Sequence, residues 1–136
     1  MSKPLTPDAI RDILTSGAPD FSGERIVDHA FYDAELEGLH AQKTVFESCS
    51  FRRANLSHAD FDRATARNGD FRGATLVSAC FYQADLRGTR FEGATLARAE
   101  LIQCDLRGAR FVGADMRGTT VDQCRLDGGE LAGAEA

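Results

Sequence analysis

The chain has 136 residues, enough for one domain, and carries 16 basic against 21 acidic side chains, for a net charge of −5. That balance argues against a general nucleic-acid binder, which would be basic. The sequence also has no apolar run long enough to span a membrane. Its first ten residues, MSKPLTPDAI, lack the apolar core of a secretory signal, so a cytoplasmic protein is expected.

A short helix is predicted within an N-terminal segment spanning residues 1–20. Thr6 suits the N-cap, Pro7 suits the first helical position, and Leu5 is placed to pack against Ile10. Gly17 supplies the stop signal. The apolar face of this helix would consist of Ile10, Ile13 and Leu14. We expect the helix to cap the structure that follows it.

From Phe21 to the C-terminus, a large apolar residue recurs at every fifth position. Of 24 such centres, 21 carry Phe, Leu, Ile, Met or Val, and the other three (Ala41, Ala66 and Ala136) carry alanine. A small residue usually stands two positions before each centre. Glycine recurs two positions after it, accounting for ten of the thirteen glycines. The second expected unit is therefore a repeat domain spanning residues 21–136.

A period of five fits neither a helix nor a flat strand. At about 100° per residue, five residues turn a helix through about 500°, which scatters the centres around it. In a strand, an odd period sends successive centres to opposite faces. The pattern requires a chain that bends once in every pentad, so that each centre points to the same interior. Glycine after the centre suits such a bend.

Vertical columns at a spacing of twenty residues indicate four pentads per coil. Alanine recurs without exception from Ala34 to Ala134 at this spacing, and Gln83, Gln103 and Gln123 form an outer ladder. The predicted core columns contain Phe31, Phe51, Phe71, Phe91 and Phe111, and Leu56, Leu76 and Leu96. Coils of this kind bury their inner faces only by stacking on their neighbours.

Runs such as FRGATL (71–76), ADLRG (84–88), FEGATL (91–96) and ADMRG (114–118) resemble the pentapeptide-repeat family. The resemblance covers residues 21–136. It implies an all-β solenoid, a right-handed quadrilateral parallel β-helix of about six coils, here with a short N-terminal capping helix.

The early pentads depart from the pattern. Leu39 stands at a small position beside Ala41 at a large one, which predicts an exchange of volume. Ala64 and Ala66 have no such compensation, so a small cavity or a local bend is expected there. His29 stands at an inward position of the first coil, where we expect distortion and an escape of the side chain towards solvent.

No capping element is apparent at the C-terminus, which ends in ELAGAEA. An open β-helix end exposes apolar side chains and strand edges, which invite contact with another molecule. Two interpretations stay open: the last coil is covered by tail-to-tail homodimerisation, or the charged tail with Glu130 and Glu135 tolerates exposure. The dimer is the favoured one.

The sequence contains no catalytic motif, no cofactor-binding loop and no metal-ligand spacing. Cys49, Cys104 and Cys124 occupy inward small positions, where free cysteine packs as a small hydrophobe. Cys80 precedes a centre and should point outward, which makes it the candidate for a reactive thiol. The repeated Asp–Arg pairs of the ADLR runs are interpreted as charge ladders on a solvated wall.

The remaining signal is the distribution of acids among the four walls. The wall that flanks the Phe21 column has a net charge of −3, from Asp20, Asp60, Asp62, Glu100 and Asp122 against Lys43 and Arg63. The wall of the Leu36 column has −2 and includes Glu35, Glu37 and Asp115. The other two walls have net charges of 0 and +1. We treat the two acidic walls as the candidate partner-binding surface.

Two functions are consistent with these features. The first is a non-enzymatic interaction or scaffold module that binds a protein partner. The second comes from the family resemblance, since some members mimic DNA, bind DNA gyrase and other type II topoisomerases, and protect them from quinolones or toxins. Neither involves a cofactor, a membrane or direct nucleic-acid contact.

Overall fold

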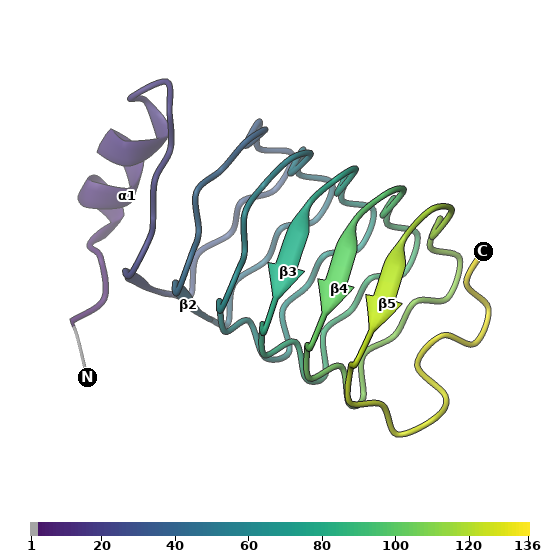
Figure 1. Ribbon diagram of the computed structural model, residues 1–136. Coiled ribbons are helices and arrows are strands. Elements are labelled where there is room, and N and C mark those ends of the chain that lie inside the picture. The colour runs from purple at the N-terminus through teal and green to yellow at the C-terminus, as the bar shows by residue number, and fades with distance from the viewer. Residues whose placement is uncertain (1–2) are drawn as a thin grey trace.

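The computed structural model describes residues 3–136; Met1 and Ser2, which begin the expected 1–20 segment, lie outside the described residues. Helix α1 (Pro7–Leu14) begins at the predicted cap, where the Ala9 N–H donates to Thr6 Oγ1 at 3.1 Å. Ile10 is buried, and the Leu5 N–H donates to the Arg25 carbonyl at 2.7 Å. The helix therefore lies over the first coil, as predicted (Figure 1).

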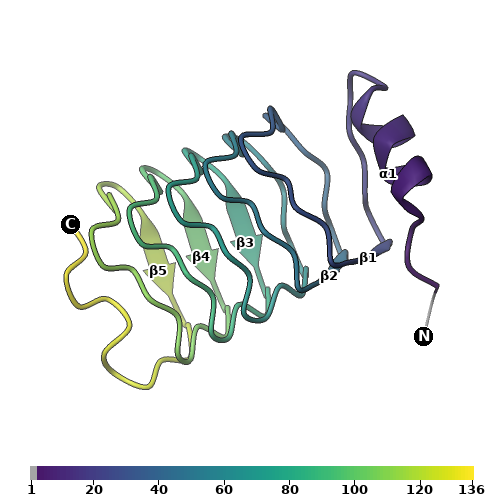
Figure 2. The ribbon, with the colours of Figure 1, turned by 180° about the vertical axis from the view of Figure 1, so that it is seen from behind.

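The rest of the chain is a parallel β-helix. Its strands are β1 (Arg25–Val27), β2 (Val45–Glu47), β3 (Cys80–Tyr82), β4 (Glu100–Ile102) and β5 (Thr120–Asp122). All pairings are parallel and join residues twenty apart, from Asp20 with His40 to Asp115 with Glu135. The predicted spacing of four pentads between stacked rungs is thereby confirmed. Figure 2 shows the rungs from behind.

One residue in every pentad bends the backbone. The residue two after each centre has a positive φ in all pentads from Gly23 to Gly133. Thirteen of these residues are not glycine, and they include Arg53 (φ 57°), Asn68 (φ 57°) and Gln83 (φ 54°). The repeat imposes the left-handed conformation even where a side chain makes it less favourable.

The core consists of stacked phenylalanine rings. Phe51, Phe71 and Phe91 follow one another at centroid distances of 5.0 Å with interplanar angles of 10° and 13°. Phe61 and Phe81 form a second stack at 4.9 Å, set edge-on to the first. All predicted core residues (Phe31, Phe51, Phe71, Phe91, Phe111, Leu56, Leu76 and Leu96) are at most 2% exposed.

The pentads that depart from the sequence pattern still keep their place in the stacked rungs. Leu39 and Ala41 are both fully buried, consistent with the predicted exchange of volume. Ala64 and Ala66 are each 1% exposed and keep the twenty-residue backbone pairing around them. His29 is half-buried against the Phe31 ring, with centroids 4.4 Å apart, so its escape to solvent is only partial.

The last coil departs from the predicted repeat. Leu126 and Leu131, expected as inward centres, are 41% and 39% exposed, and Gly113 donates to the Gly133 carbonyl, one residue later than the repeat requires. Glu130, expected as an outward acid of an exposed tail, is instead only 5% exposed. Its carboxylate accepts the Gly108 N–H at 3.0 Å, a donor that the repeat would pair with a backbone carbonyl of the next rung. The segment 127–133 loops away from the stacked rungs (Figure 1).

No helix among residues 3–136 has the length and apolar character needed to cross a membrane.

Candidate interaction face

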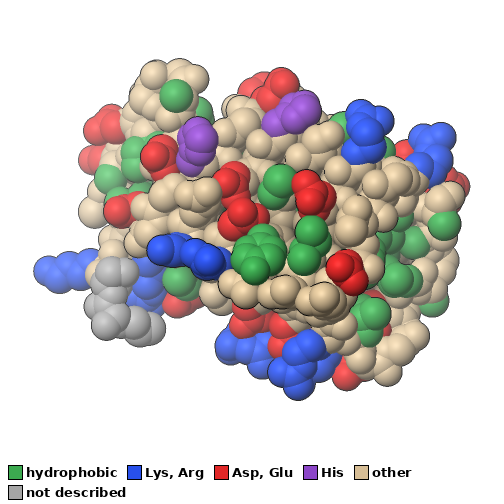
Figure 3. Space-filling view, viewed as in Figure 1, with side chains coloured by type: hydrophobic (Ala, Val, Ile, Leu, Met, Phe, Trp, Pro, Cys, Tyr) green, Lys and Arg blue, Asp and Glu red, His purple; other side chains and the backbone are tan. Residues whose placement is uncertain are grey.

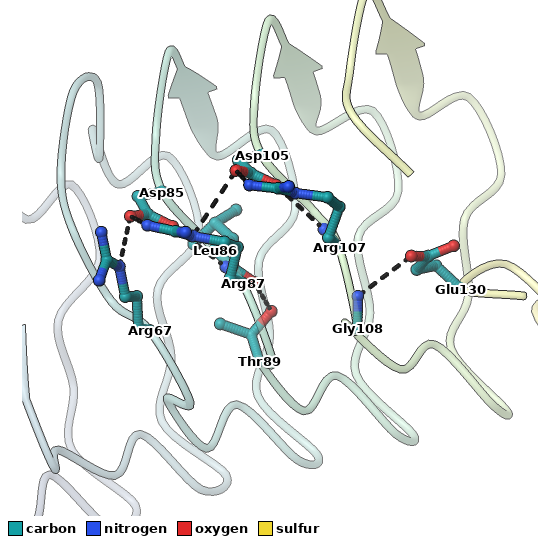
Figure 4. A network of polar contacts seen from close by, with 9 residues as sticks. All are labelled: Arg67, Asp85, Leu86, Arg87, Thr89, Asp105, Arg107, Gly108 and Glu130. Atoms are coloured by element: carbon teal, nitrogen blue, oxygen red, sulfur yellow. Dashed lines mark hydrogen bonds and ion pairs between the residues drawn. The ribbon is translucent and has the colours of Figure 1, made fainter. Parts of the chain in front are cut away.

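Since stacked residues are twenty apart, the outward side chains fall into four columns. We call the surface beside each column a face and name it by its first inward centre: the Phe21, Ile26, Phe31 and Leu36 faces. On the Ile26 face, Asp85 contacts both Arg67 (2.6 Å) and Arg87 (2.8 Å). The ladder continues as Arg87 to Asp105 (3.6 Å) and Asp105 to Arg107 (2.7 Å), as Figure 4 shows. The expected ladder of alternating charges is thus present, and it neutralises this face.

Hydrogen bonds from Arg87 and Arg67 lower the pKa of Asp85 to about 2. Similar pairs occupy the Phe31 face, where Arg72 contacts Asp70 at 2.7 Å and Arg90 contacts Glu92 at 3.1 Å. The charges of these four acids (Asp85, Asp105, Asp70 and Glu92) are therefore balanced by neighbouring arginines.

The acids of the Phe21 face are different. None of the ion pairs formed by residues 3–136 involves Asp20, Asp60, Asp62, Glu100 or Asp122. These carboxylates instead take neutral donors: Asp20 accepts from the Ser22 N–H (2.9 Å), and Asp60 accepts from the Asp62 N–H (3.0 Å). Their negative charge is left unneutralised by direct contact.

Asp60 and Asp62 are half-buried, whereas Asp20, Glu100 and Asp122 are exposed, and Asp62 lines a hollow. Asp62 accepts a hydrogen bond from the Tyr82 N–H at 2.9 Å. Partial burial raises its pKa, and the nearby Asp60 carboxylate acts in the same direction. Asp62 and Tyr82, together with Gln42, Lys43 and Arg63, line a hollow of about 230 Å³. Negative side chains lie on the face of the molecule that is turned to the viewer in Figure 3.

The face also contains two cations and a row of amides along one edge. Lys43 and Arg63 form no ion pair within residues 3–136; Arg63 donates instead to Gln83 Oε1 at 3.3 Å. From Gln83 the predicted ladder continues to Gln103 and Gln123, with a distance of 3.0 Å at each step. The cations therefore lie beside the early rungs, whereas neutral amides flank Glu100 and Asp122.

The Leu36 face does not match the Phe21 face. Asp115 forms an ion pair with Arg117 at 2.7 Å, which lowers the pKa of Asp115 to about 2. Glu35 accepts a hydrogen bond from Asn55 Nδ2 at 3.0 Å, and Glu37 is exposed. The two acidic groups predicted from the sequence are thus not equivalent: the Leu36 face includes an arginine-paired acid, whereas none of the five acids of the Phe21 face forms an ion pair within residues 3–136.

The cysteines are free thiols. Cys49 and Cys104 are buried at the expected inward positions, and burial raises their pKa values to about 11 and about 12. Cys80 points outward as predicted, with Sγ 3.9 Å from Glu100 Oε1. Partial burial raises its pKa, and the Glu100, Asp62 and Asp60 carboxylates add to the effect. A thiolate is disfavoured there, which argues against Cys80 as a reactive thiol.

Two features of the site were not identified from the sequence. One is the hydrogen bond from the Tyr82 N–H to Asp62 in the hollow that both residues line. Gln42, Asp62 and Tyr82 stand twenty residues apart, so the column spacing could have predicted that they lie together. The other is the burial of Glu130. The backbone leaves the twenty-residue stacking there, although the five-residue pattern of the sequence continues without interruption. Among residues 3–136, no cluster of His, Cys, Asp and Glu side chains is arranged to hold a metal ion.

Comparison with known proteins supports the repeat architecture. The family model "Pentapeptide repeats" matches in eight copies over residues 31–65, 59–93 and 90–128. The chain belongs to the pentapeptide repeat family. No curated protein sequence matches it.

Several solved structures are similar to the chain at low identity. Rfr23, a pentapeptide repeat protein from the cyanobacterium Cyanothece 51142, has a TM-score of 0.60 at 14% identity, covering 85% of this chain and 86% of its own. HetL from Nostoc sp. PCC 7120, involved in heterocyst differentiation regulation, has 0.53 at 17% identity, covering 96% and 94%. QnrB1, a plasmid-mediated fluoroquinolone resistance protein, has 0.48 at 18%, covering 82% and 76%. These likenesses show the fold alone.

Proposed function

We propose that the protein is a non-enzymatic interaction module that binds a basic surface of another protein through its Phe21 face. The observation that carries this proposal is that none of the five acids of this face forms an ion pair within residues 3–136, whereas each other face has acids paired with arginines, as at Asp85, Asp70 and Asp115. We also infer that the rungs close into a right-handed, four-sided coil of about six turns, as the family resemblance implies. Such a coil would hold the carboxylates on a rigid wall, so little side-chain or backbone order is lost on binding.

Charge density favours a protein partner over strict mimicry of DNA. Duplex DNA carries one negative charge per about 1.7 Å of its axis. The five acids of the Phe21 face extend over six rungs, about 25 Å at the usual strand spacing, or one charge per about 5 Å. Lys43 and Arg63 dilute the field further. A wall of this density suits scattered lysines and arginines on a folded partner.

Affinity capture from an extract of the producing cells tests the proposal. The unmodified protein and the Asp60→Lys/Asp62→Lys variant would be compared, since the reversal changes the centre of the face. Asp28→Lys/Asp33→Lys is the matched control, with the same change in net charge at exposed positions on other faces. We expect partners to be lost with the first variant and kept with the control. Equal capture by both variants would refute the role of the face.

A second candidate is modulation of DNA gyrase or another type II topoisomerase, as the family resemblance suggests. The observation that favours it is the row of unpaired carboxylates along the axis of the β-helix. A gyrase supercoiling assay, with and without a quinolone, tests this function. The protein should inhibit or protect at micromolar concentration, and Asp60→Lys/Asp62→Lys should abolish the effect. Absence of both effects rules this candidate out.

Homodimerisation through the C-terminal coil stays a prediction. The exposed Leu126 and Leu131 side chains provide apolar surface that a second copy would cover. Light scattering over a range of protein concentrations would report the mass in solution. A monomer at all concentrations would contradict this prediction.

A further inference from the structure

The Phe31 face carries a surplus of positive charge. Its outward side chains comprise five arginines (Arg52, Arg53, Arg72, Arg90 and Arg110) and three acids (Asp33, Asp70 and Glu92), once Glu130, whose carboxylate is enclosed in the last coil, is set aside. The face therefore has a net charge of +2, opposite in sign to the −3 of the Phe21 face. Arg52 forms no ion pair within residues 3–136, and Arg90 and Arg110 share Glu92 at 3.1 and 3.7 Å. Part of this positive charge is left for an acidic surface of another molecule.

Two exposed apolar side chains lie on the same face. Tyr32 is 56% exposed and Val112 is 52% exposed, and no other large apolar side chain among residues 3–125 is as open to solvent. Both belong to the column of Arg52 and Arg72, because the spacings are multiples of twenty. Tyrosine and arginine are enriched at protein interfaces and among the residues that contribute most to binding. The column thus has the composition of a protein-binding surface.

The hollow of the Phe21 face is large enough for an exposed aromatic side chain. Its volume of about 230 Å³ is that of about eight water molecules, which gives room for a tyrosine ring with its hydroxyl. Tyr82 lines the hollow and offers a ring for contact with another aromatic side chain. The Asp62 carboxylate in the same hollow is an acceptor for a phenol hydroxyl. A tyrosine from another molecule therefore matches the hollow in size and polarity.

The charges of the two faces repeat at the same interval along the axis, because both faces are built on the same stacked rungs. Residues twenty apart lie on successive rungs, which are about 4.8 Å apart. On the Phe31 face, Arg72 lies two rungs beyond Tyr32, and Arg90 lies on the rung after Arg72. The exposed tyrosine is therefore followed by one arginine at two rungs and another at three.

The acids of the Phe21 face follow the hollow at the same distances. Glu100 lies two rungs beyond the rung of Asp62, and Asp122 lies on the rung after Glu100. With two axes in the same direction, a tyrosine placed in the hollow brings the first arginine opposite Glu100 and the second opposite Asp122. The two faces of this chain therefore match each other in register as well as in sign.

We propose that two copies of this chain bind side by side with their axes in the same direction, the Phe31 face of one copy on the Phe21 face of the other. Tyr32 of one copy enters the hollow of the other, and Arg72 lies opposite Glu100. Charge complementarity determines the register, and the aromatic side chain anchors the contact. Each copy of such a pair keeps its other face free, so the contact is heterologous and further copies can add to it.

Pairing of this kind rests on the proposed function, because it uses the Phe21 face as the binding surface and names a second copy as one of its basic partners. Sedimentation velocity of the purified protein measures it without any other partner. At about 50 mM salt, the average mass should rise above the 14.7 kDa of one chain as the protein approaches about 1 mM, with a Kd below about 0.5 mM. At about 500 mM salt, the Kd should rise at least about fivefold, because exposed charges are screened.

An exchange of charges tests the register. Arg72→Glu and Glu100→Lys should each raise the Kd at least about tenfold. Both substitutions in one chain exchange the two charges and keep the net charge of the unmodified protein, so association should return. Arg98→Glu is the matched control, because Arg98 is exposed on the Leu36 face and undergoes the same change of charge as Arg72.

Tyr32→Ala tests the anchor without changing any charge. It should raise the Kd at least about tenfold, whereas Val112→Ala, which truncates an equally exposed apolar side chain of the same column, should change the Kd less than about twofold. Circular dichroism melts verify that each variant is folded.

Three results would overturn the proposed pairing. The first is an unmodified, folded protein that stays monomeric at about 1 mM and low salt; capture of a basic partner from an extract by the same protein would then leave the proposed function standing. The second is association that survives Arg72→Glu, Glu100→Lys and Tyr32→Ala unchanged, which would identify another contact between copies. The third is a charge-exchanged protein that does not associate although it is folded.

Discussion

The column of stacked rings predicts that Phe71→Ala is among the most damaging single substitutions in the chain. The Phe71 side chain is fully buried, with stacked rings at 5.0 Å on both sides and edge-on rings of Phe61 at 6.0 Å and Phe81 at 6.4 Å. Truncation to alanine removes the transfer free energy and leaves a cavity that stacked rungs cannot collapse into. We expect a loss of about 3–5 kcal/mol in the free energy of unfolding.

Urea denaturation followed by circular dichroism measures this loss. At about 2–4 °C per kcal/mol for a chain of this size, the melting temperature should fall by roughly 10–15 °C. Leu131→Ala is the matched control, because Leu131 belongs to the same column but is 39% exposed at the open end. The Leu131→Ala substitution should lower the free energy of unfolding by less than about 1 kcal/mol. A Phe71→Ala protein that melts within a degree or two of the unmodified protein would refute the argument that stacked rings hold the rungs together.

Other predictions concern single positions. Gly88→Ala should destabilise more than Gly93→Ala: both have φ +68°, but an added Cβ at Gly88 lies within 3.3 Å of Asn68 Cγ, whereas Gly93 has open space. Thermal melts should show the difference, and Asn68→Gly should remove it. The Glu130 carboxylate accepts hydrogen bonds from three backbone N–H groups, which lower its pKa to about 2. The ionised carboxylate therefore stabilises the folded protein fully above its ordinary pKa near 4.5, and this stabilisation is lost as the pH falls towards 2. The protection factor of the Gly108 amide, which is its exchange rate relative to the intrinsic rate at the same pH, should therefore fall on acidification, and Glu130→Gln should show low protection already at neutral pH; identical protection factors in both proteins would contradict this role. Cys80 should react with a thiol reagent at pH 7 more slowly than free cysteine, because burial and the Glu100 carboxylate raise its pKa; equal rates would show that the carboxylates do not act on it.

Much of the fold was predictable because each pentad repeats the same physical requirement. The inward Phe71 and the small Ala74 recur in their columns because only those volumes fill the interior, and a period of five excludes a helix and a flat strand. The twenty-residue spacing of the columns then determines which rungs stack. Thr6 and Pro7 predicted the start of α1 because capping depends on local sequence.

The bends and the last coil were less predictable. Glycine marked ten of the bends, yet Arg53 and Gln83 adopt the same left-handed φ, because hydrogen bonds between rungs impose the conformation on whichever residue stands there. Glu130 was expected to point outward, but its carboxylate is buried in the last coil, where it accepts hydrogen bonds from the backbone N–H groups of Gly108, Asp127 and Gly128. Local sequence does not reveal such a long-range exchange.

The sequence predicted which acids lie on the candidate face, but not which of them form ion pairs with arginines. Summed charges identified the Phe21 and Leu36 walls together. The structure separates them, because Arg117 forms an ion pair with Asp115, whereas Asp60 and Asp62 form no ion pair among residues 3–136 and accept hydrogen bonds from backbone N–H groups instead. Ion pairing depends on which side chains the rungs bring within about 4 Å, and a sum over a wall does not contain that information.

The central claim, that the Phe21 face binds a basic protein surface, is tested most directly by carbodiimide cross-linking of the captured complex. This reagent joins a carboxylate to a lysine only where the two are in contact, and mass spectrometry identifies the linked residues. The account predicts cross-links from Asp60, Asp62 and Glu100 to lysines of the partner. Cross-links confined to acids of the Ile26 and Phe31 faces, with none on the Phe21 face, would contradict it.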